Sequence, residues 1–165
     1  MMKKLFFLTT FVLISSICYN SYAQTNNEIN ATKGEQLFLE HANECLIQME
    51  KAAKKESFTG VAVVSFIPND LTESWISKMK VVGKIADARS NLCAIAYSKA
   101  SEMAVTLKDS GDSTRKTIDG ELGYQGGAIV KVKYGYLLAA FSGASGQQDY
   151  DVSKLSLEWL ARKFK

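Results

Sequence analysis

Apolar positions recur at steps of three and four residues in three stretches of the chain, 35–56, 87–108 and 146–163. This spacing places them on one side of a helix, so each stretch is expected to form an amphipathic helix with one buried face. The first of these faces carries Phe38, Ala42, Cys45, Met49 and Ala52. Ser145 and Gln148 stand at the spacing of a capping box, which predicts that the third helix begins directly after Ser145.

Shorter apolar runs between the helices predict strands. The run 59–67 is β-branched and almost continuously apolar, as in a buried strand, and Pro68 ends it because proline cannot donate to a ladder. A second strand is expected at 79–85, and two more at 128–133 and 136–141, where the link is short enough for a hairpin. Antiparallel strands with helices packed on them make an α+β domain.

The N-terminus has the three parts of a secretory signal peptide. A basic start at Lys3 and Lys4 leads into an apolar run, and the small residues Ser21 and Ala23 precede the expected cleavage site. The apolar run is short for a membrane span, which needs about 20 residues. A retained membrane anchor and lipid attachment at Cys18 are the alternatives.

Export divides the chain into three parts. We expect a signal peptide at 1–23, a flexible leader at 24–34 and one domain at 35–165, located in the periplasm or secreted. After cleavage no stable membrane span is expected. Loss of Lys3 and Lys4 lowers the formal net charge from +3 to +1. The mature chain is therefore nearly neutral and has no basic run of the kind that binds nucleic acid.

Two cysteines, Cys45 and Cys93, are left in the mature chain. Both fall on the apolar faces of expected helices. Export permits a disulfide between them, and burial as two small hydrophobic residues is the alternative.

Candidate chemistry is sparse. His41 is the single histidine, so a catalytic set built on histidine must use it. It is either an inert histidine at the edge of the helix's buried face or an axial ligand to haem iron. The carboxylates Asp149 and Asp151 are expected on a solvated helix face, and the glycine-rich turn at 142–146 is expected to be structural. No catalytic motif is present, so whether the chain is an enzyme stays open.

The C-terminal half contains a recognisable series of residues: Gly126-Gly127-Ala128-Ile129, then a run from Gly135 to Gly146, then Gln148-Asp149 and a helix. This series resembles the GlcG/HbpS-like family of haem-binding or haem-degrading proteins. The likeness spans most of 35–163 and is sharpest between Gly126 and Asp149. The chain departs from the family pattern at Ala128, which no proline follows, and at 68–77, where the family has a tighter hairpin.

The resemblance implies a profilin-like fold, with about five antiparallel strands flanked by helices. It also implies self-association into a homo-oligomer and haem as the cofactor, with haem degradation or haem and redox sensing as activities. His41 is then the candidate iron ligand, and Arg89, Arg115 and Lys116 are candidate partners of the haem propionates, because cations bind carboxylates well. The alternative is a non-catalytic module on the same fold that binds another small ligand or a protein, which the altered 68–77 segment favours.

Overall fold

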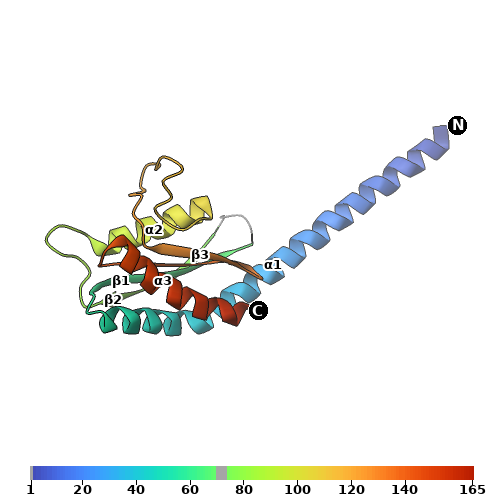
Figure 1. Cartoon of the computed structure of the whole chain (residues 1–165). Coiled ribbons are helices and arrows are strands. Elements are labelled where there is room, and N and C mark those ends of the chain that lie inside the picture. Colours follow the sequence, from blue (N-terminus) through green and yellow to red (C-terminus); the bar gives the residue numbers. More distant parts are fainter. Residues whose placement is uncertain (1, 70–73) are drawn as a thin grey trace.

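The protein is an α+β domain built on an antiparallel sheet, as seen in a computed structural model (Figure 1). The structure describes the backbone of residues 2–69 and 74–165, and the side chains from residue 28 onward outside that gap. In chain order the elements are α1 Met2–Lys55, β1 Gly60–Pro68, β2 Ile76–Val82, α2 Leu92–Thr106, β3 Gly127–Val132, β4 Gly135–Ser142, α3 Gly146–Ala161 and the 3-10 helix η1 Arg162–Phe164.

The sheet has the strand order β2-β1-β4-β3, with every neighbouring pair antiparallel. The central strands β1 and β4 consist almost entirely of buried residues, which explains their unbroken apolar sequences. The described residues form four strands, where the family resemblance implies about five. The hairpin between β3 and β4 turns at Lys133 and Tyr134, since Val132 already pairs with Gly135.

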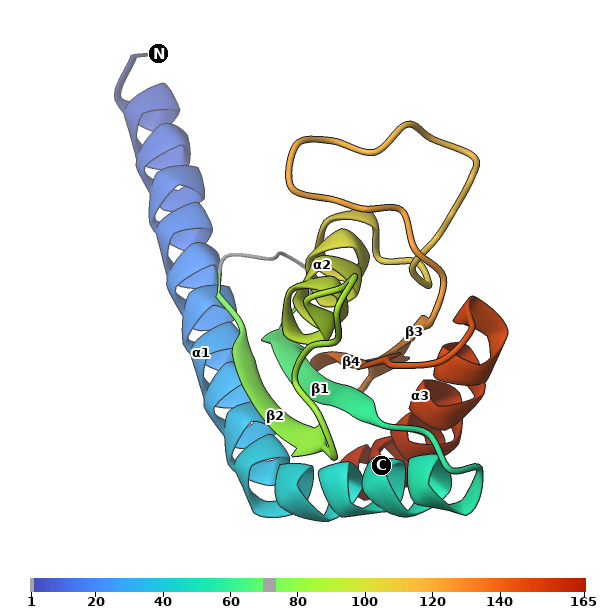
Figure 2. The same cartoon turned by 90° about the vertical axis from the view of Figure 1, so that its left-hand side faces the viewer.

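Helices α1 and α3 cover one face of the sheet and α2 covers the other (Figures 1 and 2). Alternate residues of β1 therefore enter two different cores. Val64 and Phe66 belong to the large core under α1 and α3, whereas Val61 and Val63 pack against α2. At the centre of the larger core the ring of Phe66 lies between those of Phe38 and Phe164.

Most of the expected elements are confirmed, with shifted boundaries. The strand expected at 79–85 is β2, which begins at Ile76 and ends at Val82; Ile85 lies in the exposed loop that follows. The first helix was expected to begin at 35, but α1 also contains residues 24–34, for which the sequence predicted a flexible leader. Gly34 is buried, and a Cβ there would meet Phe66 and Tyr134, so this part of α1 packs on the sheet.

The two cysteines lie in different cores. Cys45 is buried under α1 and α3, and Cys93 packs in the cluster under α2. Both are free, because the sheet separates the two clusters. The disulfide alternative is therefore wrong for this structure.

The signal peptide stays a prediction, because the side chains of 1–23 lie outside the described residues, as do residues 70–73 of the altered 68–77 segment. Within the part of the chain that the structure describes, no helix combines the length and the apolar character needed to cross a membrane.

Candidate functional site

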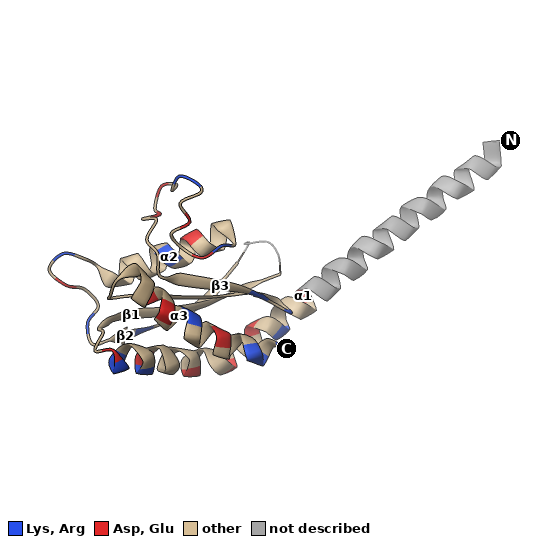
Figure 3. Cartoon of the chain, in the orientation of Figure 1, with Lys and Arg blue, Asp and Glu red and all other residues tan. Residues whose placement is uncertain are grey.

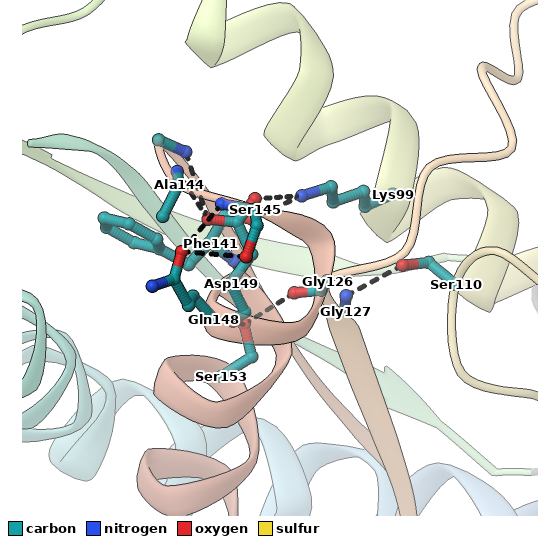
Figure 4. A network of polar contacts seen from close by, with 11 residues as sticks. Lys99, Ser110, Gly126, Gly127, Phe141, Ala144, Ser145, Gln148, Asp149 and Ser153 are labelled. Carbon is teal, nitrogen blue, oxygen red and sulfur yellow. Dashed lines mark hydrogen bonds and ion pairs between the residues drawn. The ribbon is translucent and has the colours of Figure 1, made fainter. Parts of the chain in front are cut away.

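A buried ion pair joins α2 to the start of α3 at the end of the sheet (Figure 4). The Lys99 ammonium donates to Asp149 Oδ2 at 2.7 Å and to the carbonyl oxygen of Phe141 at 2.8 Å. The side chains of Lys99 and Asp149 are 2% and 4% exposed, so both charges are almost fully removed from water. Buried charges of this kind require a partner, which here each provides for the other.

Asp149 also fixes the turn that leads into α3. Its Oδ1 accepts the backbone N–H groups of Gly143 at 3.2 Å and Ala144 at 2.9 Å. At the helix start, Gln148 reaches back and its Oε1 accepts the backbone N–H of Ser145 at 3.2 Å, which confirms the expected capping box. One turn later, Ser153 Oγ accepts the N–H of Phe141 at 2.8 Å. The turn is thus held by side chains of the helix that it begins.

Burial opposes ionisation of both partners. It raises the pKa of Asp149 and lowers that of Lys99, while the opposite charge of each partner limits the shift of the other. A lysine whose pKa is lowered by burial, next to a carboxylate and beside a cleft, is the type of group that concentrates at functional sites.

The ion pair forms part of the wall of a cleft of about 400 Å³. One side comes from the first turns of α2 and α3, including Leu92 and Gly146, so the positive ends of two helix dipoles lie at the cleft. Tyr124 and Gln125 of the loop between α2 and β3 form part of another side. The remaining lining residues are Asp87, Ser90, Ile95, Gly123, Ser142, Gly143 and Ala144.

A second cleft, of about 450 Å³, adjoins the first through Gln125, which lines both. The side-chain amide of Gln125, the residue that lines both clefts, donates to Gln147 Oε1 at 3.2 Å. In the second cleft, Tyr150 donates its hydroxyl to Asp109 Oδ2 at 2.9 Å. The first cleft offers mainly hydrogen-bonding groups to a ligand, whereas the second is lined by polar and apolar surface in similar amounts.

His41, the candidate iron ligand, lies in α1 outside these clefts. Its ring packs edge-on against Trp159 of α3 with the ring centroids 6.4 Å apart, and its Nε2 is 3.8 Å from Glu40 Oε1. The described residues contain no group of three or more histidine, cysteine or acidic side chains placed to hold a metal ion.

The three candidate propionate partners lie in loops. Arg89 is exposed in the loop between β2 and α2, in the same loop as the cleft residues Asp87 and Ser90. Arg115 is engaged by Glu121, with Nη2 at 2.6 Å from Oε1, and Lys116 beside it is exposed. Arg115 and Lys116 belong to the loop after α2, whereas His41 lies between α1 and α3, so the structure does not bring the predicted haem residues together within one chain.

The sequence reasoning missed Lys99 as a site residue and was wrong about Asp149. The latter was expected on a solvated helix face, but it is 3% exposed. One sequence signal was available for Lys99: it falls between Ala96 and Ala100 and four residues before Met103, within the apolar face of its own helix. A charged residue inside a buried stripe implies a buried partner.

Comparisons with known proteins add a distant structural similarity. No protein-family model matches the chain, and no curated protein matches it in sequence. The structure is similar to a crystal structure of the yeast Ybr137w protein, with a TM-score of 0.49 and 18% sequence identity over 81% of this chain and 88% of that chain. These comparisons assign the chain to no family.

Proposed function

We propose that this is an exported ligand-binding protein that holds a small polar ligand in the cleft beside Lys99 and Asp149. The observation that carries the proposal is the buried ion pair in the cleft wall, next to the first turns of two helices. The helix ends favour a ligand with carboxylate or other acceptor groups. Asp87 and Gln125 offer acceptor atoms for ligand hydroxyl or amine groups.

A nuclear magnetic resonance titration tests this proposal. Amide spectra are recorded with single amino acids, hydroxy acids and monosaccharides, each added separately. One of these classes should shift the signals of Gly143, Ala144 and Gln125 in a saturable way. Tyr124→Ala should weaken that binding about tenfold, because it removes a large contact surface from the cleft wall.

Ile118→Ala is the matched control, since Ile118 lies in the same loop and is exposed but is not part of the cleft wall. Its affinity should equal that of the unchanged protein. If none of the three ligand classes shifts the cleft amides, or if both variants lose affinity equally, the proposal fails.

Haem is the second candidate ligand, and the sequence resemblance favours it. The stretch in which the chain resembles the GlcG/HbpS-like family, 126–149, is also the stretch that supplies Ser142, Gly143, Ala144 and Asp149 to the cleft. A profilin-like domain that assembles into a homo-oligomer is the fold and state that this candidate implies.

His41, the candidate iron ligand, lies outside the described clefts, so haem bound at His41 and haem bound in the cleft are two different placements. Of the residues in the cleft wall, Tyr124 is exposed and has an oxygen that ligates iron in some haem proteins. A haemin titration separates the two placements. If Tyr124→Phe loses the Soret shift, haem binds in the cleft, and if His41→Ala loses it, haem binds at α1. If the unchanged protein gives no Soret shift, haem is excluded as the ligand.

Export has its own test. The protein isolated from the medium or periplasm should begin at Gln24, as measured by intact mass. A mass that includes the first 23 residues would show that the apolar segment is retained.

A further inference from the structure

Lysine and arginine residues lie near one another at the corner where the β3–β4 hairpin, the C-terminus and α1 meet (Figure 3). A groove of about 470 Å³ lies there. Its lining combines the basic residues Lys131, Lys133, Arg162 and Lys165 with the apolar residues Val132, Ala161 and Phe164. No acidic side chain is among these lining residues.

Two lysines from outside the groove extend this basic corner. Lys33 of α1 lies with its Nζ 5.6 Å from the ring centroid of Tyr134, and Lys133 approaches the same ring to 5.4 Å. Lys163 lies over the ring of Trp159 at 5.0 Å. The pKa of Tyr134 is lowered, first by the Lys33 ammonium beside it and then by Lys133, as expected where positive charge accumulates.

Five basic residues of this corner have no acidic partner among the residues whose side chains the structure describes. Among residues 28–69 and 74–165, Lys33, Lys133, Arg162, Lys163 and Lys165 have no carboxylate within salt-bridge distance. At the opposite end of α1, by contrast, Lys54 and Lys80 both pair with Glu50. What distinguishes this corner is that several basic side chains gather around one groove that has no acidic lining residue, which leaves it with an excess of positive charge.

Apolar groups accompany the charge. The groove has three apolar lining residues, and Ile29, four residues before Lys33 and hence near it on the surface of α1, is 59% exposed. Clustered lysine and arginine with an exposed apolar side chain match the chemistry of an anionic lipid surface.

We propose that this basic corner docks the domain onto membranes that contain anionic lipids. The lysines and Arg162 approach the lipid phosphates, and the exposed Ile29 enters the boundary between headgroups and acyl chains. This surface is separate from the cleft at Lys99, so it stands whether or not the cleft binds a ligand.

Vesicle sedimentation tests the proposal on the protein as isolated from the exporting cells. The vesicles contain either phosphatidylcholine alone or an equal mixture with phosphatidylglycerol. Binding should be stronger to the mixed vesicles, and it should weaken as salt is added because the attraction is screened. The double variant Lys133→Glu/Lys165→Glu should lower the partition coefficient on mixed vesicles by about 30-fold or more.

The matched control is Lys51→Glu/Lys55→Glu, which makes the same change in net charge on exposed residues near the end of α1. It should keep most of the binding, and thermal unfolding should show that both double variants are folded. Equal binding to the two kinds of vesicle, or equal loss in the two variants, overturns the proposal. Saturable binding of dodecyl phosphate monomers without vesicle binding also overturns it, since the groove would then hold a soluble amphiphile.

Discussion

The two faces of the sheet are built differently. Among the described residues, one continuous cluster of nineteen buried apolar residues lies under α1 and α3, whereas the α2 face has two clusters of five. The α2 side buries more polar groups, among them Ser98, Lys99, Glu102 and Ser110. It also carries the loop from 107 to 126, which has no helix or strand.

This difference separates stability from candidate function. Apolar burial is the main favourable contribution to folding, so the α1/α3 face is expected to supply most of it. Polar groups are costly to bury and are retained where they hold a turn or meet a ligand. The ion pair joins Lys99 of α2 to Asp149 of α3, and so it connects the helices of the two faces. Mutation of this pair can therefore separate a contribution to stability from a contribution to ligand binding.

The largest effect is expected at the ion pair itself. Lys99→Met keeps most of the side-chain volume but leaves Asp149 buried without its cation, and it should lower the free energy of unfolding by about 3–5 kcal/mol. Urea denaturation followed by circular dichroism measures this loss. The double variant Lys99→Met/Asp149→Asn should recover part of the loss, because the amide keeps an acceptor for Gly143 and Ala144 without a charge. If the loss of unfolding free energy in the double variant equals the sum of the losses in the two single variants, Lys99 and Asp149 are not coupled.

The sequence predicted the α+β class and most of the elements, because these elements are locally encoded. The apolar stripe that includes Phe38, Cys45 and Met49 specified the packed part of α1, and the capping residues marked the start of α3. The errors fall at exposed boundaries. The β2 strand was placed too late because Ile85 continues the apolar pattern although it is 52% exposed.

The site was harder to predict because its partners are far apart in the chain. Lys99 and Asp149 are fifty residues apart, and no local period relates them. A carboxylate near the start of a helix is usually solvated, which is what the sequence predicts for Asp149, whereas its contacts in the structure are with Lys99 and the preceding turn. The two side chains meet because α2 and α3 both pack against β4.

A smaller effect is expected from two neighbouring valines that face opposite sides of β1. Val64→Ala should cost about 2–3 kcal/mol of unfolding free energy, since it opens a cavity in the continuous α1/α3 core. Val63→Ala removes the same atoms from the small α2 cluster, where half-buried neighbours can close the space, and should cost about 1–2 kcal/mol. The same urea measurement compares them, and equal costs would contradict the division between the faces.

The backbone beside the ion pair gives the next test. Gly126 has φ of 132°, and a Cβ there would meet the Lys99 ammonium and lie 2.6 Å from Asp149 Cβ. Gly126→Ala should therefore cost about 2 kcal/mol. Gly120→Ala is the control, because Gly120 also has a positive φ, of 93°, but nothing lies within 4 Å of its Cβ position, so only backbone strain of about 1 kcal/mol remains. If Gly126→Ala lowers the unfolding free energy less than Gly120→Ala does, the Lys99–Asp149 pair moves aside freely.

The mildest test uses the thiols of Cys45 and Cys93 as reporters of local opening. Cys45 is fully buried, its Sγ donates to Ser156 O at 3.5 Å, and burial raises its pKa to about 12. At pH 8 it is protonated and shielded, so it should react with a disulfide reagent only when the protein unfolds, because the thiolate is the nucleophile. Cys93 is partly exposed at the start of α2 and should react in the native state.

Peptide mapping after labelling assigns the reaction, and Cys93→Ser should abolish the fast phase while Cys45→Ser leaves it intact. Rapid labelling of Cys45 would mean that the α1/α3 core opens as readily as the α2 side, and the contrast between the two faces would be lost.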